Sequence, residues 1–146
     1  MMELDTIMST ELVTVSPGDS LADARRLMRK HRIHHLPVTV DKDHLVGLVT
    51  LTDVLAASDS ILREPGARLQ PADVRIADVM IRNIPTVREG ASLRQAALFL
   101  EKHRVGCLPV VTEGRLVGIV TDTDFVGVAI NLLEQIEDSE PLDEAI

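Results

Sequence analysis

The sequence predicts an α/β fold in which two β-α-β-β-α units pack as a pseudo-twofold tandem module. The first observation is an internal repeat: residues 7–38 match residues 79–110, and "LVGLVTLTD" at 45–53 returns as "LVGIVTDTD" at 116–124. The second is the alternation, within each copy, of short β-prone runs and a segment of helical apolar periodicity. The third is that a single unit of this kind leaves one sheet face bare, which a second copy would cover.

Each copy is expected to begin with a short strand, "LVTV" or "IPTV", followed by a helix. Ser20 and Ser92 stand at the N-cap positions of these helices. Ser92 with Gln95 predicts a proper capping box, and the Ser20-x-x-Asp23 version is expected to be weaker. Two strands then follow, "HLPVTV" and "LVGLVT" or "CLPVVT" and "LVGIVT", and their short connection predicts a hairpin. The last helix of each unit begins at Thr-x-Thr-Asp.

The repeat also sets the predicted domain limits. Pro65-Gly66 and Pro71 mark a linker, and the acidic C-terminal segment is expected to fray after about Ile136. The predicted parts are a first unit at 1–62, a linker at 63–78, a second unit at 79–133 and an acidic tail at 134–146.

Composition excludes several classes of function. The 146 residues carry a formal charge of −8 and contain two Phe, no Trp and no Tyr, which argues against nucleic-acid binding by a basic groove or by aromatic stacking. No apolar run approaches the ~18 residues that span a bilayer, so we expect no membrane insertion, and the N-terminus does not resemble a signal peptide. A single cysteine, Cys107, fits a reducing cytoplasm.

The repeated Thr-x-Thr-Asp element has two interpretations that the residues leave open. It can simply cap the following helix. It can also form a nucleoside clamp, because an Asp accepts hydrogen bonds from neighbouring ribose hydroxyls and Thr hydroxyls donate to ribose or phosphate oxygens. Its occurrence at two equivalent places, where a pseudo-twofold axis would bring helix N-termini together, favours the clamp.

These motifs resemble those of the CBS domain. The resemblance rests on Thr-Val before a Ser-Leu helix, "HRIHHLPV" or "HRVGCLPV", and "GLVTLTD" or "GIVTDTD", and it covers about residues 5–130 as a tandem CBS pair, or Bateman module. It implies a regulatory module that binds AMP, ADP, ATP or S-adenosylmethionine in two symmetry-related clefts and signals to an effector protein. Such modules commonly form homodimers, and C2 dimers are the commonest oligomers.

The resemblance also implies which residues would form the clefts. In both, the motif Asp would hold the ribose and aliphatic residues would enclose the base. One cleft would use Thr50, Thr52 and Asp53 with Pro85 and Val105; the other would use Thr121, Thr123 and Asp124 with Val13 and Ile33.

The two clefts are not expected to be equivalent. His34 and His35 precede "LPV" where the family often places phosphate-binding basic residues, whereas the second copy has Gly106 and Cys107 and adds Asp122 beside the clamp. Because a carboxylate repels phosphate, the Asp53 cleft is expected to take a phosphorylated ligand. The Asp124 cleft is expected to be empty, weak or selective for a ligand without phosphates.

Other sequence features receive structural interpretations. His34 and His35 lack a third ligand at metal spacing, so no metal site is expected, and His31 and His103 are expected to close helices. Cys107 is expected to be a core residue, and the Arg-rich segment around Arg25 a solvated helix face. No nucleophile elbow, Walker loop or Rossmann fingerprint is present, so an enzyme is not expected. The open alternatives are a ligand-free dimerisation or docking module and a regulatory fragment of a larger enzyme or transporter.

Overall fold

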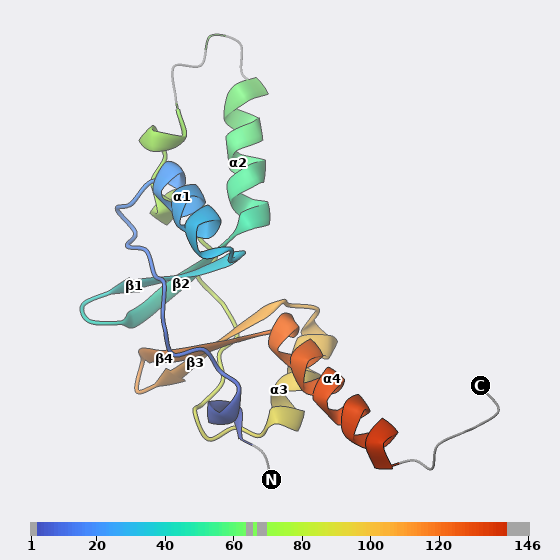
Figure 1. The fold of residues 1–146 in the computed structure, drawn as a ribbon. Helices are drawn as coiled ribbons and strands as arrows, with labels where there is room; N and C mark the ends of the chain where they lie inside the picture. The colour runs from blue at the N-terminus through green and yellow to red at the C-terminus, as the bar shows by residue number, and fades with distance from the viewer. Residues whose placement is uncertain (1–2, 64–65, 67–69, 140–146) are drawn as a thin grey trace, which may run out of the picture.

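The computed structural model describes residues 3–63, 66 and 70–139 (Figure 1). The first repeat contains α1, β1, β2 and α2, and the second contains α3, β3, β4 and α4 in the same order. Short 3-10 helices precede each repeat. The bounds are η1 Leu4–Thr6, α1 Leu21–His31, β1 His35–Val40, β2 His44–Thr50, α2 Leu51–Arg63, η2 Pro71–Asp73, η3 Ile76–Asp78, α3 Leu93–His103, β3 Cys107–Thr112, β4 Arg115–Thr121 and α4 Asp122–Ser139.

The strands form one antiparallel sheet in the order β1-β2-β4-β3. Each hairpin has a register shift at an equivalent place, after Val38 and after Val110, and the hairpins join through the pair His44–Arg115. Figure 1 shows the two hairpins at the centre, with α1 and α2 on one side and α3 and α4 on the other. The predicted α/β tandem fold is confirmed.

The leading strand of each unit is shorter than the sequence predicts. "LVTV" and "IPTV" each supply a single bridging residue, Val15 beside Val38 and Val87 beside Val110. The amide of Val15 donates to the Pro37 carbonyl at 3.0 Å, and the second repeat makes the equivalent bond. The chain crosses the edge of the hairpin at this point and then turns to the helix, so it pairs only briefly.

Both first helices begin at a capping box. The Ser20 amide donates to Asp23 Oδ2 at 3.0 Å, and the Ser92 amide donates to Gln95 Oε1 at 3.4 Å. The expectation that the first box is the weaker one is therefore wrong. The Asp23 carboxylate accepts a charge-assisted bond, which is stronger than the bond to a neutral amide. The bond from the Ser20 backbone is also the main reason why the pKa of Asp23 lies below its usual value.

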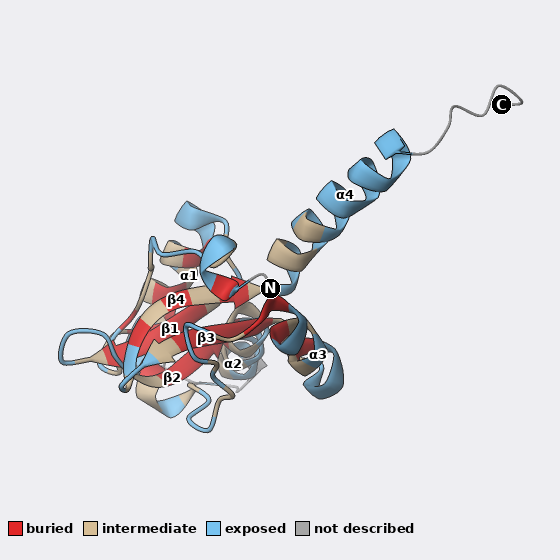
Figure 2. Ribbon diagram, turned by 90° about the horizontal axis from the view of Figure 1, so that it is seen from below, coloured by how far each residue is buried: buried red, intermediate tan, exposed pale blue. Residues whose placement is uncertain are grey.

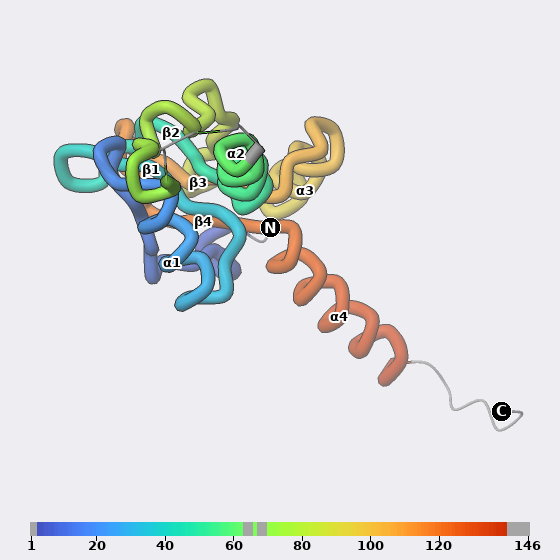
Figure 3. Tube along the Cα trace, turned by 90° about the horizontal axis from the view of Figure 1, so that it is seen from above, coloured from blue at the N-terminus to red at the C-terminus, as the bar shows by residue number. Residues whose placement is uncertain are grey.

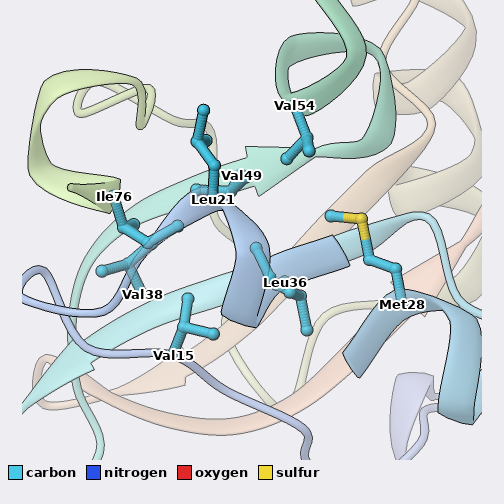
Figure 4. Packing of buried hydrophobic residues seen from close by; sticks show 9 residues of the cluster. Val15, Leu21, Met28, Leu36, Val38, Val49, Val54 and Ile76 are labelled. Carbon is cyan, nitrogen blue, oxygen red and sulfur yellow. The ribbon is translucent and has the colours of Figure 1, made fainter. Parts of the chain in front are cut away.

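The two repeats have separate aliphatic cores. The first core lies between α1, α2 and the β1-β2 hairpin, and Leu36 and Val49 are among its fully buried members (Figure 4). The second core has Leu108 and Val120 at the equivalent positions. Figure 2 shows buried residues concentrated on the strands, with exposed residues over the outer helices and loops.

Each core contains a residue from the segment that precedes the other repeat. Leu4 of η1 is buried in the second core, and the Leu4 amide donates to the Ala91 carbonyl at 3.1 Å. Ile76 of η3 is buried in the first core, and the Ile76 amide donates to the Asp19 carbonyl at 2.8 Å. Part of the predicted linker is therefore packed against the first unit. The predicted domain limits stay a prediction.

We call residues 4–9 and 76–81 the exchanged segments, because each packs on the repeat that it does not precede. They explain why glycine recurs at positions 47 and 118 of the strands. The segments pair with the sheet through two bridges, Ser9 with Ile119 and Leu48 with Ile81. A Cβ on Gly47 would lie 2.8 Å from Met80 Sδ, and a Cβ on Gly118 would lie 2.6 Å from Met8 Sδ. Glycine is favoured here because a Cβ would require the methionine side chain to move and would lie within 3.0–3.3 Å of the Ile81 or Ser9 carbonyl oxygen.

Helix α4 is longer than predicted and extends away from the rest of the fold. It continues to Ser139, so the expected fraying after Ile136 is wrong, and residues 140–146 of the predicted tail lie outside the described residues. Figures 2 and 3 both show its C-terminal half projecting beyond the strands and the other helices. Across the described residues, no helix combines the length and apolar character that crossing a bilayer requires.

Candidate functional site

A cavity of about 320 Å³ lies where the Thr-x-Thr-Asp element of the second repeat meets the first repeat. Its volume is at the lower end of the range for small-molecule sites. Four parts of the chain form it: the segment after η1, the residues leading into β1, the end of β4 and the start of α4. The lining residues are Ser9, Glu11, Leu12, Val13, Arg32, Ile33, His34, His35, Pro37, Ile119, Thr121, Asp122, Thr123 and Asp124.

The cavity assembles one of the two residue sets that the sequence predicts. Thr121 ends β4, Thr123 and Asp124 lie in the first turn of α4, and Val13 and Ile33 face them from the first repeat. These five residues come together because the segment after η1 pairs with β4, where the Ser9 amide donates to the Ile119 carbonyl at 2.9 Å.

The Thr-Asp elements also cap the helices that follow them. Thr121 Oγ1 donates to Asp124 Oδ2 at 3.3 Å, and the Thr121 amide donates to the same oxygen at 2.9 Å. The capping bonds themselves run from the Asp124 amide to Thr121 Oγ1 at 3.4 Å and from the Asp53 amide to Thr50 Oγ1 at 3.2 Å. In the first repeat, Thr50 Oγ1 also donates to Asp53 Oδ2 at 2.7 Å. Both carboxylates remain partly exposed. The capping role is thus present in both repeats, and it holds each carboxylate in a fixed position.

For the other predicted set, the structure defines separate local environments. Thr50 and Asp53 form the cap just described, and Thr52 is exposed on the first turn of α2. Val105 packs against the second core, and Pro85 is half-buried between η3 and α3. Their joint role as a second cleft stays a prediction.

The structure places His34 and His35 in the cavity of Asp124, whereas the sequence pattern assigned them to the Asp53 cleft; their role in ligand binding stays a prediction. His35 begins β1 of the first repeat, but its ring extends toward the second repeat. His35 Nε2 and Asp122 Oδ2 both flank Gly106, at 3.3 and 3.5 Å from the position that a Cβ would occupy. The small residue Gly106 leaves the space that the His35 ring occupies.

Burial controls the protonation of two groups near this cavity. The pKa of His35 is lowered mainly by desolvation of the charged imidazole; the Asp122 carboxylate opposes this shift and His34 adds to it. Burial raises the pKa of the Cys107 thiol to about 12, so the thiol stays protonated and Cys107 is a core residue, as expected. Within the described part of the chain, no three His, Cys, Asp or Glu side chains are grouped so as to hold a metal ion.

Sequence reasoning missed several cavity residues. Arg32 reaches the cavity because it ends α1 in the left-handed conformation, with φ 54°, and so turns the chain toward β1. Arg104 has the same conformation at the end of α3, and the repeated "HR" after each first helix is the signal that could have revealed this turn. The segment after η1 carries no such sequence signal. The other cavity residues that sequence reasoning missed are Ser9, Glu11 and Leu12 from this segment and Pro37 and Ile119 from the strands.

Comparisons with known proteins agree with this architecture. The CBS domain family model matches residues 4–60 and 76–131. The crystal structure of a putative acetoin utilization protein (AcuB) from Vibrio cholerae is 37% identical, with a TM-score of 0.81, covering 97% of this chain and 99% of that one. The CBS domain pair of protein MJ0100, in complex with 5-methylthioadenosine and S-adenosyl-L-methionine, is 26% identical, with a TM-score of 0.78 and coverage of 90% and 98%.

Two further relatives bear on function. CBSX2 from Arabidopsis thaliana, solved in complex with AMP, is 28% identical, with a TM-score of 0.77 and coverage of 91% and 99%. An inosine-5'-monophosphate dehydrogenase from Korarchaeum cryptofilum is 39% identical over 115 residues, but the chain spans only 21% of its length. The chain spans less than half the length of several curated relatives that it matches. The two family matches, one on each repeat, show that the chain belongs to the CBS-domain family as a tandem pair.

Proposed function

We propose that this CBS pair is a cytoplasmic regulatory module that binds an adenosine-containing ligand between its repeats and signals the bound state to an effector protein. The ligand class is AMP, ADP, ATP or S-adenosylmethionine, and the module acts as a homodimer. The observation that carries the proposal is the cavity at the start of α4, where partly exposed Thr and Asp side chains face an aliphatic wall. Relatives of the same fold bind AMP, or S-adenosyl-L-methionine and 5-methylthioadenosine.

The cavity residues divide into two chemical groups. Asp124 can accept hydrogen bonds from two ribose hydroxyls, and the hydroxyl of Thr123 can donate to a ligand oxygen. Val13, Ile33 and Ile119 supply apolar surface for a base. The chain has no Trp and no Tyr, so aliphatic contacts replace aromatic stacking.

Charge favours a ligand without phosphates in this cavity. Glu11, Asp122 and Asp124 line it together with one Arg, Arg32. The lowered pKa of His35 keeps its ring neutral at pH 7, so it does not offset the carboxylates. A phosphate would meet net repulsion, whereas a neutral or cationic substituent on the ribose would not. S-adenosylmethionine and methylthioadenosine are of this kind.

Thermal unfolding against a ligand panel tests the proposal. AMP, ADP, ATP, S-adenosylmethionine and methylthioadenosine would each be added to the wild type, Asp124→Ala, Asp53→Ala and the control Asp138→Ala, which lies on the exposed end of α4. A ligand at 100 times its Kd adds ~2.7 kcal/mol, which moves the midpoint by several degrees. A shift with an unphosphorylated ligand that only Asp124→Ala removes supports the proposed site.

Two other results would change the assignment. A shift that only Asp53→Ala removes would move the site to the other predicted cleft, formed by Thr50, Thr52, Asp53, Pro85 and Val105. Comparing AMP binding by His34→Ala and Asp124→Ala would then show which group matters for a phosphate. Flat curves for the whole panel would support the second candidate function, a ligand-free dimerisation module. The hydrogen bonds between Thr121 and Asp124 favour that candidate, since they already give the element a structural role.

A further inference from the structure

The cavity at the start of α4 contains a titratable ring at a position where the two repeats differ. His35 is half-buried at the start of β1, and its Nε2 lies 3.3 Å from the position that a Cβ on Gly106 would occupy. The second repeat has Cys107 at the start of β3, and burial raises the pKa of that thiol to about 12. Near neutral pH, this position can therefore gain or lose a proton in the first repeat only.

A carboxylate of the second repeat accompanies the ring. Asp122 Oδ2 lies 3.5 Å from the same Cβ position on Gly106, while Asp122 Oδ1 accepts a hydrogen bond from the Thr123 amide at 2.9 Å. The elements packed around the ring carry several further charged or titratable side chains. These are Glu11 after η1, Arg32 at the end of α1, His34 before β1, Asp53 in the first turn of α2, Arg104 at the end of α3 and Asp124 in the first turn of α4.

The charge of the cavity depends on its histidine rings. The charged lining residues are Glu11, Asp122, Asp124 and Arg32, which give a formal charge of −2 while the rings are neutral. A proton on His35 removes one unit of this negative charge at a half-buried position. Coulomb repulsion of an anionic ligand falls accordingly, and the effect is larger here than at an exposed surface because solvent screens it less.

Binding of a phosphate and binding of a proton must promote each other in such a cavity. Desolvation lowers the pKa of His35, so the ring is neutral at pH 7. A phosphate close to the ring supplies an opposite charge, which raises the pKa of an imidazole by about one unit or more. By linkage, the protonated cavity then binds that phosphate about tenfold more tightly or better. A ligand without charge has no such effect on the ring.

We propose that His35 makes ligand choice in this cavity depend on pH, because its neutral ring favours an adenosine ligand without phosphates and its protonated ring admits a 5′-phosphate. The inference rests on the proposed function, since it concerns the same cavity, and it names the residue that decides between AMP and methylthioadenosine. A module of this kind responds to acidification as well as to the concentration of its ligand.

Calorimetric titration with AMP and with methylthioadenosine at pH 7.5 and pH 5.5 tests the proposal. The proteins are the wild type, His35→Gln, His34→Gln and the matched control His31→Gln, whose side chain is exposed at the end of α1 and does not line the cavity. Glutamine keeps a polar side chain but takes up no proton in this range. Circular dichroism at both pH values checks that each variant is folded.

The expected pattern separates the ring from the ligand. The Kd of the wild type for AMP should fall about tenfold or more between pH 7.5 and pH 5.5, and the Kd for methylthioadenosine should not fall. The phosphate of AMP itself titrates near pH 6, so the readout is the difference between the wild type and His35→Gln. His31→Gln should behave as the wild type does.

Proton NMR gives a second readout, which a merely structural role of His35 would not move. The chain has five His, and the imidazole resonance that is absent from the spectrum of His35→Gln identifies this ring. Its titration midpoint should rise by about one pH unit when AMP is saturating. With methylthioadenosine it should not rise.

Three results would overturn the inference. One is an AMP affinity with the same pH dependence in the wild type and His35→Gln, or a dependence that only His34→Gln removes; binding of methylthioadenosine at pH 7.5 would then still support the proposed function. The second is AMP binding that Asp124→Ala leaves intact at pH 5.5, because it would lie outside this cavity. The third is absence of binding by both ligands at both pH values, which would refute the proposed function as well.

Discussion

The two repeats are alike where the backbone constrains them, and they differ at a side chain that reaches the other repeat and in the length of the last helix. Both keep a capping serine, a left-handed Arg at the end of the first helix and a glycine beneath the crossing segment. They differ where His35 replaces the equivalent Cys107, and where the last helix has 13 residues in one repeat and 18 in the other. The comparison separates residues that specify the fold from residues that specialise each half.

The largest effect is expected from the exchanged core residues. Leu4→Ala removes a fully buried side chain from the second core, and Ile76→Ala does the same to the first. Each should lower the free energy of unfolding by about 2–5 kcal/mol, since a cavity remains. Denaturant unfolding measures the loss, and Leu62→Ala, at an exposed position, is the control.

Hydrogen exchange sharpens this prediction. Leu4→Ala should reduce amide protection in β3 and β4 more than in β1 and β2, and Ile76→Ala should do the reverse. Loss of protection in the repeat that follows each residue in the sequence would contradict the exchange of segments.

The repeated glycines are expected to show the next largest effect. A Cβ at Gly47 would also lie 3.0 Å from the Ile81 carbonyl oxygen, and at Gly118 it would lie 3.3 Å from the Ser9 carbonyl oxygen. Gly47→Ala and Gly118→Ala should each destabilise by about 1–3 kcal/mol through overpacking, with Gly47→Ala the more costly. Gly127→Ala is the matched control, because nothing lies within 4 Å of its Cβ position and alanine favours a helix. If all three variants were equally stable, the close approach of the exchanged segments would not explain why glycine occupies positions 47 and 118.

Substitutions in the two capping boxes are expected to have a smaller effect on stability, and a similar one in both repeats. Ser20→Ala and Ser92→Ala should each lower stability by about 1 kcal/mol. Asp23→Asn should lower the free energy of unfolding by an amount that depends on pH, whereas the effect of Gln95→Ala should not depend on pH. The pKa of Asp23 is depressed in the folded state, so its contribution is present above the unfolded value near 3.8 and is lost as the pH falls. Thermal midpoints between pH 2.5 and pH 6 measure this difference, and a parallel response of both variants would contradict it.

The smallest effect is expected at His35, the residue that most distinguishes the two repeats. Because its folded pKa is lowered, the unfolded chain binds the proton first as the pH falls through 6.5, and stability decreases. His35→Cys, the residue at the equivalent position of the second repeat, should flatten the midpoint between pH 7 and pH 5. Asp122→Asn removes the carboxylate that raises this pKa and should steepen the same profile. If both variants follow the wild-type slope, the imidazole is not the titrating group.

The repeated pattern predicted the tandem fold, the hairpins and the helix starts, because capping serines and apolar periodicity act over a few residues. The resemblance to the CBS domain, and not the repeat itself, assigned Val13, Ile33 and Asp124 to one set, which the structure places around one cavity. It assigned His34 and His35 to the other cleft, because strand position alone does not say which repeat a ring faces. That depends on the space left by Gly106 and on the path of the crossing segment, which are contacts between distant residues.

The exchange of leading segments also bears on how such a chain can arise. A half-length ancestor with one repeat would lack the residue that completes its own core and would carry the one that completes a neighbour's. Two copies would finish each other as a symmetric pair. Duplication and fusion of the gene would turn that bimolecular association into an intramolecular one, and each position would then be encoded twice. From that point mutations could give one half a histidine or a longer acidic helix without imposing it on the other.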